Sequence, residues 1–264
     1  MDFENKLEIN NFEQKKKKFF TNFALKFREQ FKLHEQHGLW EKQDSWKNVS
    51  EHCLVEAARC EIFAEKLELS KKITDYLVQA GILHDFYKKQ EIIKTKNQDK
   101  SYEAFANIYE QAHHALQAAK ISQEIIDITD KIDQTAFDDI EIMLSQKELS
   151  EKDVASLVLN YVDSYTINTE WAVTASLDEN NKKINDLDKR VLKNMTNPNY
   201  QKINEQGKKY FNGMTTYEKQ LEIGNRIEKR LTELLNQKNN LNIDQKDLPT
   251  FIDGHIKEKI KNIE

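Results

Sequence analysis

The sequence predicts an all-α fold, and three observations support this prediction. Only two prolines and six glycines occur among the 264 residues, so the residues that form turns are scarce. Charged residues make up 32% of the chain, and many are good helix formers such as Lys and Glu. Apolar residues recur at the spacing of one helix face through most of the chain. Long helices are therefore expected in place of turn-rich β-structure.

The N-terminal segment predicts an amphipathic helix that packs on the core. Phenylalanines recur at close to helical spacing between residues 12 and 31, and Lys15–Lys18 lie beside or opposite them. A membrane-surface anchor or a basic phosphate-binding patch would also use such a helix. Interspersed acidic residues and the many phenylalanines favour packing instead. We assign residues 1–44 to this packing segment.

Two histidine-bearing helices are expected next. The first carries His52. The second has Ser70 as its candidate N-cap and ends at His84 and Asp85. An apolar stripe reaches His84 at helical spacing, so its imidazole is expected to point inward. Because only a short turn separates the two helices, they are expected to be antiparallel neighbours.

The rest of the chain is also expected to be helical. Helices are predicted over residues 101–119 and 122–135, and Ser150 can cap a helix so apolar on all sides that it must be central. From about residue 177 the apolar stripes become narrower and the outer faces charged. The predicted organisation is a core domain over 45–176 and a helical extension over 177–264 that packs on it. The stripes of the extension include Leu177, Ile184, Leu187 and Val191.

Composition limits the classes of partner and compartment. The formal net charge of -5 and a pI near 5.9 give no overall attraction to nucleic acid or to an anionic membrane. No apolar run is long enough for a membrane span, and the N-terminus lacks the order of a signal peptide, so a cytoplasmic location is expected. Cys53 and Cys60 are too far apart on one helix for a disulfide, and we expect reduced packing residues. Nucleic-acid binding through Lys15–Lys18 ranks below binding of a small ligand.

Four residues together suggest a metal site: His52, His84, Asp85 and Asp163. Asp163 lies in "NYVDSY", where no adjacent Lys or Arg can neutralise a carboxylate in apolar surroundings. Two imidazoles and two carboxylates suit a divalent transition metal such as Mn, Fe, Co, Ni or Zn. His84 and Asp85 are adjacent, and they can converge on one ion only at a helix end.

This pattern resembles the signature of the HD superfamily of metal-dependent phosphohydrolases, a His, then a His-Asp doublet, then a distant Asp. "VSEHCLVEAARCEIFAEKLELSKKITDYLVQAGILHDFYKK" resembles the first two elements, and "LVLNYVDSYT" resembles the last. The resemblance covers about residues 45–170. It implies an HD-like helical bundle in which His52, His84, Asp85 and Asp163 bind the metal. It also implies that Asp85 orients the attacking water.

The resemblance assigns two further residues. Lys88 keeps the lysine of the Ile-Gly-Lys that often follows the doublet, so it is expected to contact phosphate, whereas Tyr87 replaces the glycine. His114 in "AHHALQAAK" is similar to an accessory histidine of members that hold two metals. Asp133 and Gln134 stand where another histidine is expected. One ion is therefore expected, and a second ion stays an open alternative.

Two hypotheses about function follow from the resemblance. The first is hydrolysis of a small phosphate ester, with a nucleotide as the expected class. The second is a regulatory protein that binds a nucleotide without turnover, because the accessory histidines are incomplete and the turn after the doublet is altered. For Arg59, contact with a substrate phosphate and surface pairing with Glu56 or Glu61 are both open. Three histidines in polar stretches are expected on the surface: His34, His37 and His255.

Overall fold

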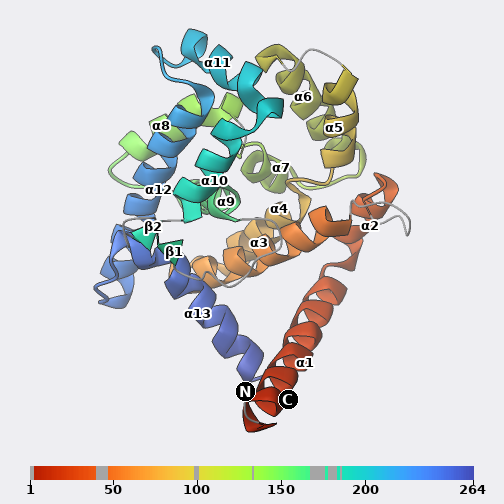
Figure 1. The fold of residues 1–264 in the computed structure, drawn as a ribbon, viewed down its shortest axis with the longest axis vertical. Coiled ribbons are helices and arrows are strands. Elements are labelled where there is room, and N and C mark those ends of the chain that lie inside the picture. The colour runs from red at the N-terminus through yellow and green to blue at the C-terminus, as the bar shows by residue number, and fades with distance from the viewer. Residues whose placement is uncertain are drawn as a thin grey trace.

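The computed structural model describes residues 3–39, 47–97, 101–132, 134–166, 176–177, 183–184 and 186–264. These residues are almost entirely helical, as the sequence predicts (Figure 1). The strand pairing among them is a two-residue antiparallel ladder of β1 (Ser176–Leu177) and β2 (Lys183–Ile184). The α-helices are α1 (Phe3–Lys26), α2 (Arg28–Gln36), α3 (Lys47–Lys66), α4 (Lys71–Leu83), α5 (Lys88–Asn97), α6 (Tyr102–Ala118), α7 (Gln123–Thr129), α8 (Phe137–Ser145), α9 (Glu151–Tyr165), α10 (Asp186–Thr196), α11 (Gln201–Tyr210), α12 (Thr216–Asn239) and α13 (Leu248–Lys261). Short 3-10 helices are η1 (Gln134–Ala136), η2 (Pro198–Tyr200) and η3 (Gln245–Asp247).

Helices α3 and α4 form a closely packed antiparallel pair. A Cβ atom placed on Gly81 of α4 would lie 3.2 Å from Ala57 Cα and 3.4 Å from Cys60 Sγ, both on α3. The missing side chain therefore allows the two backbones to approach each other. As a consequence, the ring centroids of His52 and His84 lie 5.7 Å apart.

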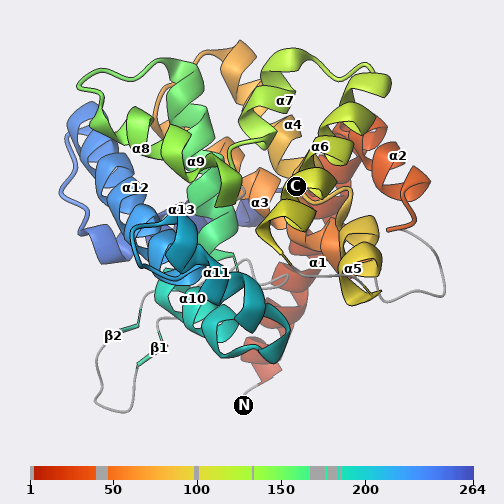
Figure 2. The ribbon, with the colours of Figure 1, turned by 90° about the horizontal axis from the view of Figure 1, so that it is seen from above.

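Helix α9 is central, as its apolar sequence predicts. Ser150 and Asp153 form a capping box at its N-terminus, and nearly all its residues from Val154 to Tyr165 are buried. It packs against α3, α4, α7, α10 and α12. Helices α10 and α12 contact α9, and α11 packs against α12 and α10 (Figures 1 and 2). The C-terminal third of the chain thus covers one side of the α9 region.

The C-terminus meets the N-terminal helix away from this centre. Helices α1 and α13 diverge from the body, and the end of α13 approaches the middle of α1 (Figure 1). Lys15 donates a hydrogen bond of 2.8 Å to the Lys261 carbonyl, and Lys18 donates one to the Glu264 carbonyl. Phe23 and Phe27 are buried, so the N-terminal helix packs as expected. Its predicted single helix is broken at Phe27, where α1 gives way to α2.

Arg59 differs from both sequence-based expectations. It is 2% exposed, and its guanidinium donates to both oxygens of Asp253 at 2.9 and 2.8 Å. A third donor, Nη1, lies 2.7 Å from Thr166 Oγ1. Arg59 therefore joins α3, α9 and α13 as a buried structural residue, and the surface pairing with Glu56 or Glu61 is wrong.

Several element boundaries also differ from the sequence-based expectation. Leu177 and Ile184 lie in strands and not in a helical stripe, whereas Leu187 and Val191 are buried in α10. The helix predicted over 122–135 ends at Thr129. Ser70 is the N-cap residue of α4, as expected, but its hydroxyl donates to Glu151 and makes no capping hydrogen bond. No helix among the described residues combines the length and apolar character needed to cross a bilayer.

His34 is buried, so the expectation of a surface histidine is wrong. Its Nδ1 lies 2.9 Å from Ser50 Oγ, and its Nε2 lies 2.7 Å from the Ile82 carbonyl. The neutral ring accepts from the hydroxyl and donates to the carbonyl, which joins α2 to α3 and α4. Burial lowers the pKa of His34 to about 4. His37 is half-buried against Phe86.

The contact at Gly81 can be tested by substitution. We expect Gly81→Val to lower the free energy of unfolding by about 2 kcal/mol or more, because the added methyl groups meet the α3 backbone. Gly254 in α13 has no atom within 4 Å of an added Cβ. As a control, Gly254→Ala is expected to raise stability by up to about 1 kcal/mol. Urea unfolding measures both, and a Gly81→Val protein as stable as the native one would contradict the close approach.

His34 predicts a pH dependence of stability. Its pKa is about 4 in the folded state and 6.5 ordinarily, so the unfolded chain binds more protons between these values. His34 makes its full contribution to the free energy of unfolding above pH 6.5, and this contribution is lost as the pH falls toward 4. Between pH 7.5 and pH 5 the expected loss is about 2 kcal/mol.

The measurement is urea unfolding at several pH values with a chelator present. His34→Gln can keep hydrogen bonds to Ser50 and Ile82 but cannot titrate. Its unfolding free energy is expected to change less over this pH range. Equal slopes for the two proteins would assign the pH dependence to other groups.

Candidate metal centre

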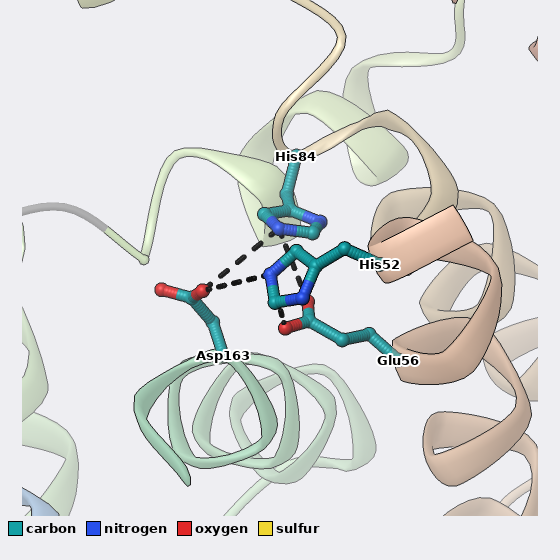
Figure 3. Close-up of side chains that lie close together, drawn as sticks. All are labelled: His52, Glu56, His84 and Asp163. Carbon is teal, nitrogen blue, oxygen red and sulfur yellow. Dashed lines mark ion pairs between the residues drawn. The ribbon is translucent and has the colours of Figure 1, made fainter. Parts of the chain in front are cut away.

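Four side chains converge where α3, α4 and α9 meet (Figure 3). They are His52 and Glu56 of α3, His84 at the end of α4, and Asp163 of α9. Each offers one ligand atom, and these atoms all lie within 4.8 Å of one another. We call this group the metal cluster. It contains three of the four principal ligands that the sequence suggests. The fourth member is Glu56, which the sequence suggests only as one possible surface partner of Arg59.

Local structure explains why these side chains converge. His52 and Glu56 are four residues apart on α3, so they share one helix face. His84 follows the last turn of α4, and its Nδ1 lies 2.9 Å from the Gly81 carbonyl. With Nδ1–H donating to that carbonyl, the Nε2 atom of a neutral His84 points its lone pair at the metal cluster. Asp163 faces the two histidines from the last turn of α9.

The distances place one carboxylate between two imidazoles. His52 Nε2 lies 2.9 Å from Glu56 Oε1, and His84 Nε2 lies 3.1 Å from Glu56 Oε2. Asp163 Oδ1 lies 3.8 Å from His52 Nε2 and 3.9 Å from His84 Nε2. Glu56 is completely buried. Despite the short distances, neither of its oxygens nor His84 Nε2 is aligned for a hydrogen bond within the described part of the chain.

The charges in the metal cluster stabilise one another. Burial alone would lower the pKa of His52, but the carboxylates of Glu56 and Asp163 raise it to about 10. Burial alone would raise the pKa of Asp163, but Arg190 and the two histidines bring it well below its usual range. Without a metal ion, therefore, a proton on His52 and the guanidinium of Arg190 balance the carboxylates. Metal binding at such a site is expected to release a proton.

Asp85 and Lys88 lie beside the metal cluster and not within it. Asp85 Oδ2 is 3.8 Å from His84 Nε2, and Asp85 Oδ1 is 3.4 Å from Lys88 Nζ. Burial alone would raise the pKa of Asp85, but Lys88 and His84 lower it. Lys88 also lies 3.2 Å from Glu91 Oε2, and the two acidic neighbours raise its pKa despite burial. Asp85 is thus kept ionised next to the proposed ligands.

Two adjoining cavities lead away from the metal cluster, with volumes of about 90 and about 200 Å³. His84 lines the smaller cavity, and Asp85, Lys88, Asp163 and Arg190 line both. Arg190 comes from α10, outside the segment that resembles the HD superfamily, and its Nη2 lies 3.2 Å from Asp163 Oδ1. Tyr109 also lines both cavities, and the larger one adds further aromatic and amide side chains: Tyr200, Tyr217, Gln134, Asn160, Asn194 and Gln220.

His114 is not brought to the metal cluster. It is exposed on α6, where its Nε2 lies 3.8 Å from Glu110. Its neighbour His113 is half-buried, with Nδ1 2.7 Å from Asp130 Oδ2. Both histidines line a separate cavity of about 470 Å³. Asp133 lies outside the described residues.

The metal cluster fits a divalent cation. It presents two imidazoles and two carboxylates, the mixed nitrogen and oxygen set that transition metals bind. A cation among them would coordinate the Glu56 oxygens and His84 Nε2, which are buried and make no hydrogen bond in the described structure. The signal for Glu56 in the sequence was its spacing of four residues from His52, on the inward face of the same helix.

Comparisons with known proteins add no relative of this chain. No family model, no curated protein and no solved structure matches it. The geometry of the metal cluster and the two cavities is therefore the basis for interpreting function.

Metal content tests the ligand set directly. We expect the native protein, purified without chelator, to hold about one transition-metal ion per chain by elemental mass spectrometry. Glu56→Gln and His84→Ala are each expected to weaken binding at least about tenfold, because each removes one ligand. The control is Glu65→Gln, also on α3, whose side chain is 44% exposed and pairs with Lys259. Unchanged metal content in Glu56→Gln would remove Glu56 from the site.

Proposed function

We propose that this chain is a metal-dependent phosphohydrolase with a core similar to the HD superfamily, acting on a small phosphate ester, with a nucleotide as the favoured class. The observation that carries the proposal is the buried metal cluster, two of whose residues, His84 and Asp163, also line a cavity. Two cations, Lys88 and Arg190, line that same cavity. A divalent ion and cations around one cavity would stabilise the charge that develops in phosphoryl transfer.

The residues of the centre would divide the work as follows. His52, Glu56, His84 and Asp163 would hold a divalent ion, which would act as a Lewis acid and activate water. Asp85 would orient the attacking water and accept its proton at Oδ2, the oxygen that lies on the side of His84. Its low pKa keeps it ready to accept a hydrogen bond from that water.

The cavity walls support a phosphate ester as the substrate. Lys88 and Arg190 would neutralise the phosphate and the negative charge that develops during attack. In the larger cavity, tyrosine rings offer surfaces for stacking, and side-chain amides offer paired donors and acceptors. Such a wall suits a nucleobase and a sugar, which is why a nucleotide is the favoured class.

A second candidate function is a regulatory protein that binds a nucleotide without turnover. The observation that favours it is the charge pairing of Asp163 with Arg190 and of Asp85 with Lys88. These pairs balance the carboxylates with the protein's own cations, so the fold can persist without a metal ion. Nucleotide binding by calorimetry with no product released would support this candidate.

Activity assays separate the two candidates. Metal-supplemented protein is expected to release phosphate from at least one member of a nucleotide panel, and chelation is expected to abolish the release. Asp85→Asn should keep its metal but lose about 100-fold or more in kcat, because it no longer accepts a proton. The control Asp75→Asn changes an α4 residue that does not line either cavity. Full activity in Asp85→Asn would contradict its role.

A further inference from the structure

We propose that Arg190 is a displaceable counter-ion of the metal cluster, which couples metal binding to the binding of an anion in the adjoining cavities. In the structure, Arg190 pairs with Asp163. When Asp163 binds a metal ion, Arg190 leaves Asp163 and pairs with a phosphate-like anion in the cavities. This inference rests on the metal site of the proposed function, and it adds that the metal and the anion bind cooperatively.

One oxygen atom, Asp163 Oδ1, lies near both histidines and Arg190. Asp163 Oδ1 is the atom nearest to both imidazoles, at 3.8 Å from His52 Nε2 and 3.9 Å from His84 Nε2. The same Oδ1 lies 3.2 Å from Arg190 Nη2. A divalent cation held by the two histidines and Asp163 would therefore meet the guanidinium charge at that oxygen. Two cations on one oxygen in a partly buried site repel each other, so Arg190 weakens metal binding while it stays there.

Arg190 lies where it can reach an anion in the cavities. Its side chain is 25% exposed and lines both cavities. Nη1 donates to the Thr166 carbonyl, and Nε is buried with no hydrogen-bond acceptor among the described residues. A guanidinium that loses its carboxylate in such surroundings is unfavourable unless another anion approaches. Its planar fork of N–H groups matches two oxygens of a phosphate.

Lys88, the other cation of the cavities, lacks this link. It lies between Asp85 and Glu91, at 3.4 and 3.2 Å, and neither carboxylate belongs to the metal cluster. A metal ion in the cluster would therefore leave both ion pairs of Lys88 in place. Arg190, in contrast, pairs with Asp163, which the metal would bind. The coupling is therefore assigned to Arg190.

Binding of the two ligands must then be reciprocal. If a bound anion stabilises Arg190 away from Asp163, it raises the affinity for the metal, and the metal raises the affinity for the anion by the same factor. Couplings of this kind between two sites change affinity by about 5- to 150-fold. We expect about tenfold for a single exchanged ion pair.

Calorimetric titration of Mn²⁺ with and without inorganic phosphate tests the coupling. In the native protein, phosphate is expected to tighten Mn²⁺ binding about tenfold after subtraction of Mn²⁺ titrated into phosphate alone. Arg190→Gln is expected to bind Mn²⁺ more tightly than the native protein without phosphate, and to lose the phosphate effect. Arg190→Lys keeps the charge without the fork, so it is expected to retain only part of the effect.

A matched control separates this effect from a change in net charge. Arg226→Gln removes the same charge from α12, where Arg226 is 41% exposed and pairs with Glu141 and Glu222. It is expected to behave like the native protein. If Arg190→Gln binds Mn²⁺ no more tightly, or keeps the phosphate effect, Arg190 is not the coupling residue, although the metal site stands. If the native protein binds no Mn²⁺, this inference and the proposed function both fail.

Discussion

Glu56 is completely buried between His52 and His84, and a carboxylate in that position is costly unless positive charge surrounds it. The surrounding helices meet this requirement. The absent side chain at Gly81 lets α4 approach α3, which brings His84 to Glu56 from the opposite helix. Helix α9 then presents Asp163 to the same two histidines. The packing of three helices thus places His52, His84 and Asp163 around Glu56, and it makes their meeting point suitable for a cation.

A continuous set of polar contacts extends this constraint to the C-terminal helices. Asp253 of α13 holds the Arg59 guanidinium, and Arg59 donates in turn to the Thr166 side chain. The backbone carbonyl of Thr166 accepts from Arg190, whose other end meets Asp163. Buried partners in such a network depend on one another. The helices after residue 186 therefore help to position Asp163 of the metal cluster, in addition to covering α9. Two of the cavity tyrosines, Tyr200 and Tyr217, come from this part of the chain.

Local patterns were sufficient for the fold class, the central helix and most of the metal cluster. Apolar spacing predicts where helices form, and His52, His84 and Asp163 stand out because each is a polar residue on an inward face. Glu56 is on that same face, but a glutamate four residues from a histidine is equally common on a surface. Only the depth of α3 in the core distinguishes the two cases. The burial of α3 depends on its packing against α4 and α9, and the spacing of residues along one helix carries no information about that packing.

Arg190 shows a second limit, since 27 residues separate it from Asp163 and only tertiary structure joins them. A sequence without neighbouring cations around Asp163 suggested that a metal ion must balance its charge. The structure supplies an arginine in that role, so the need for a metal rests on Glu56 and His84, whose buried atoms make no hydrogen bond in the described residues. A fold optimised only for stability would replace these groups with apolar ones, because a buried charge cluster seldom stabilises a protein. Retaining an incompletely satisfied, charged centre beside a cavity is the kind of local conflict found where binding or catalysis constrains the sequence.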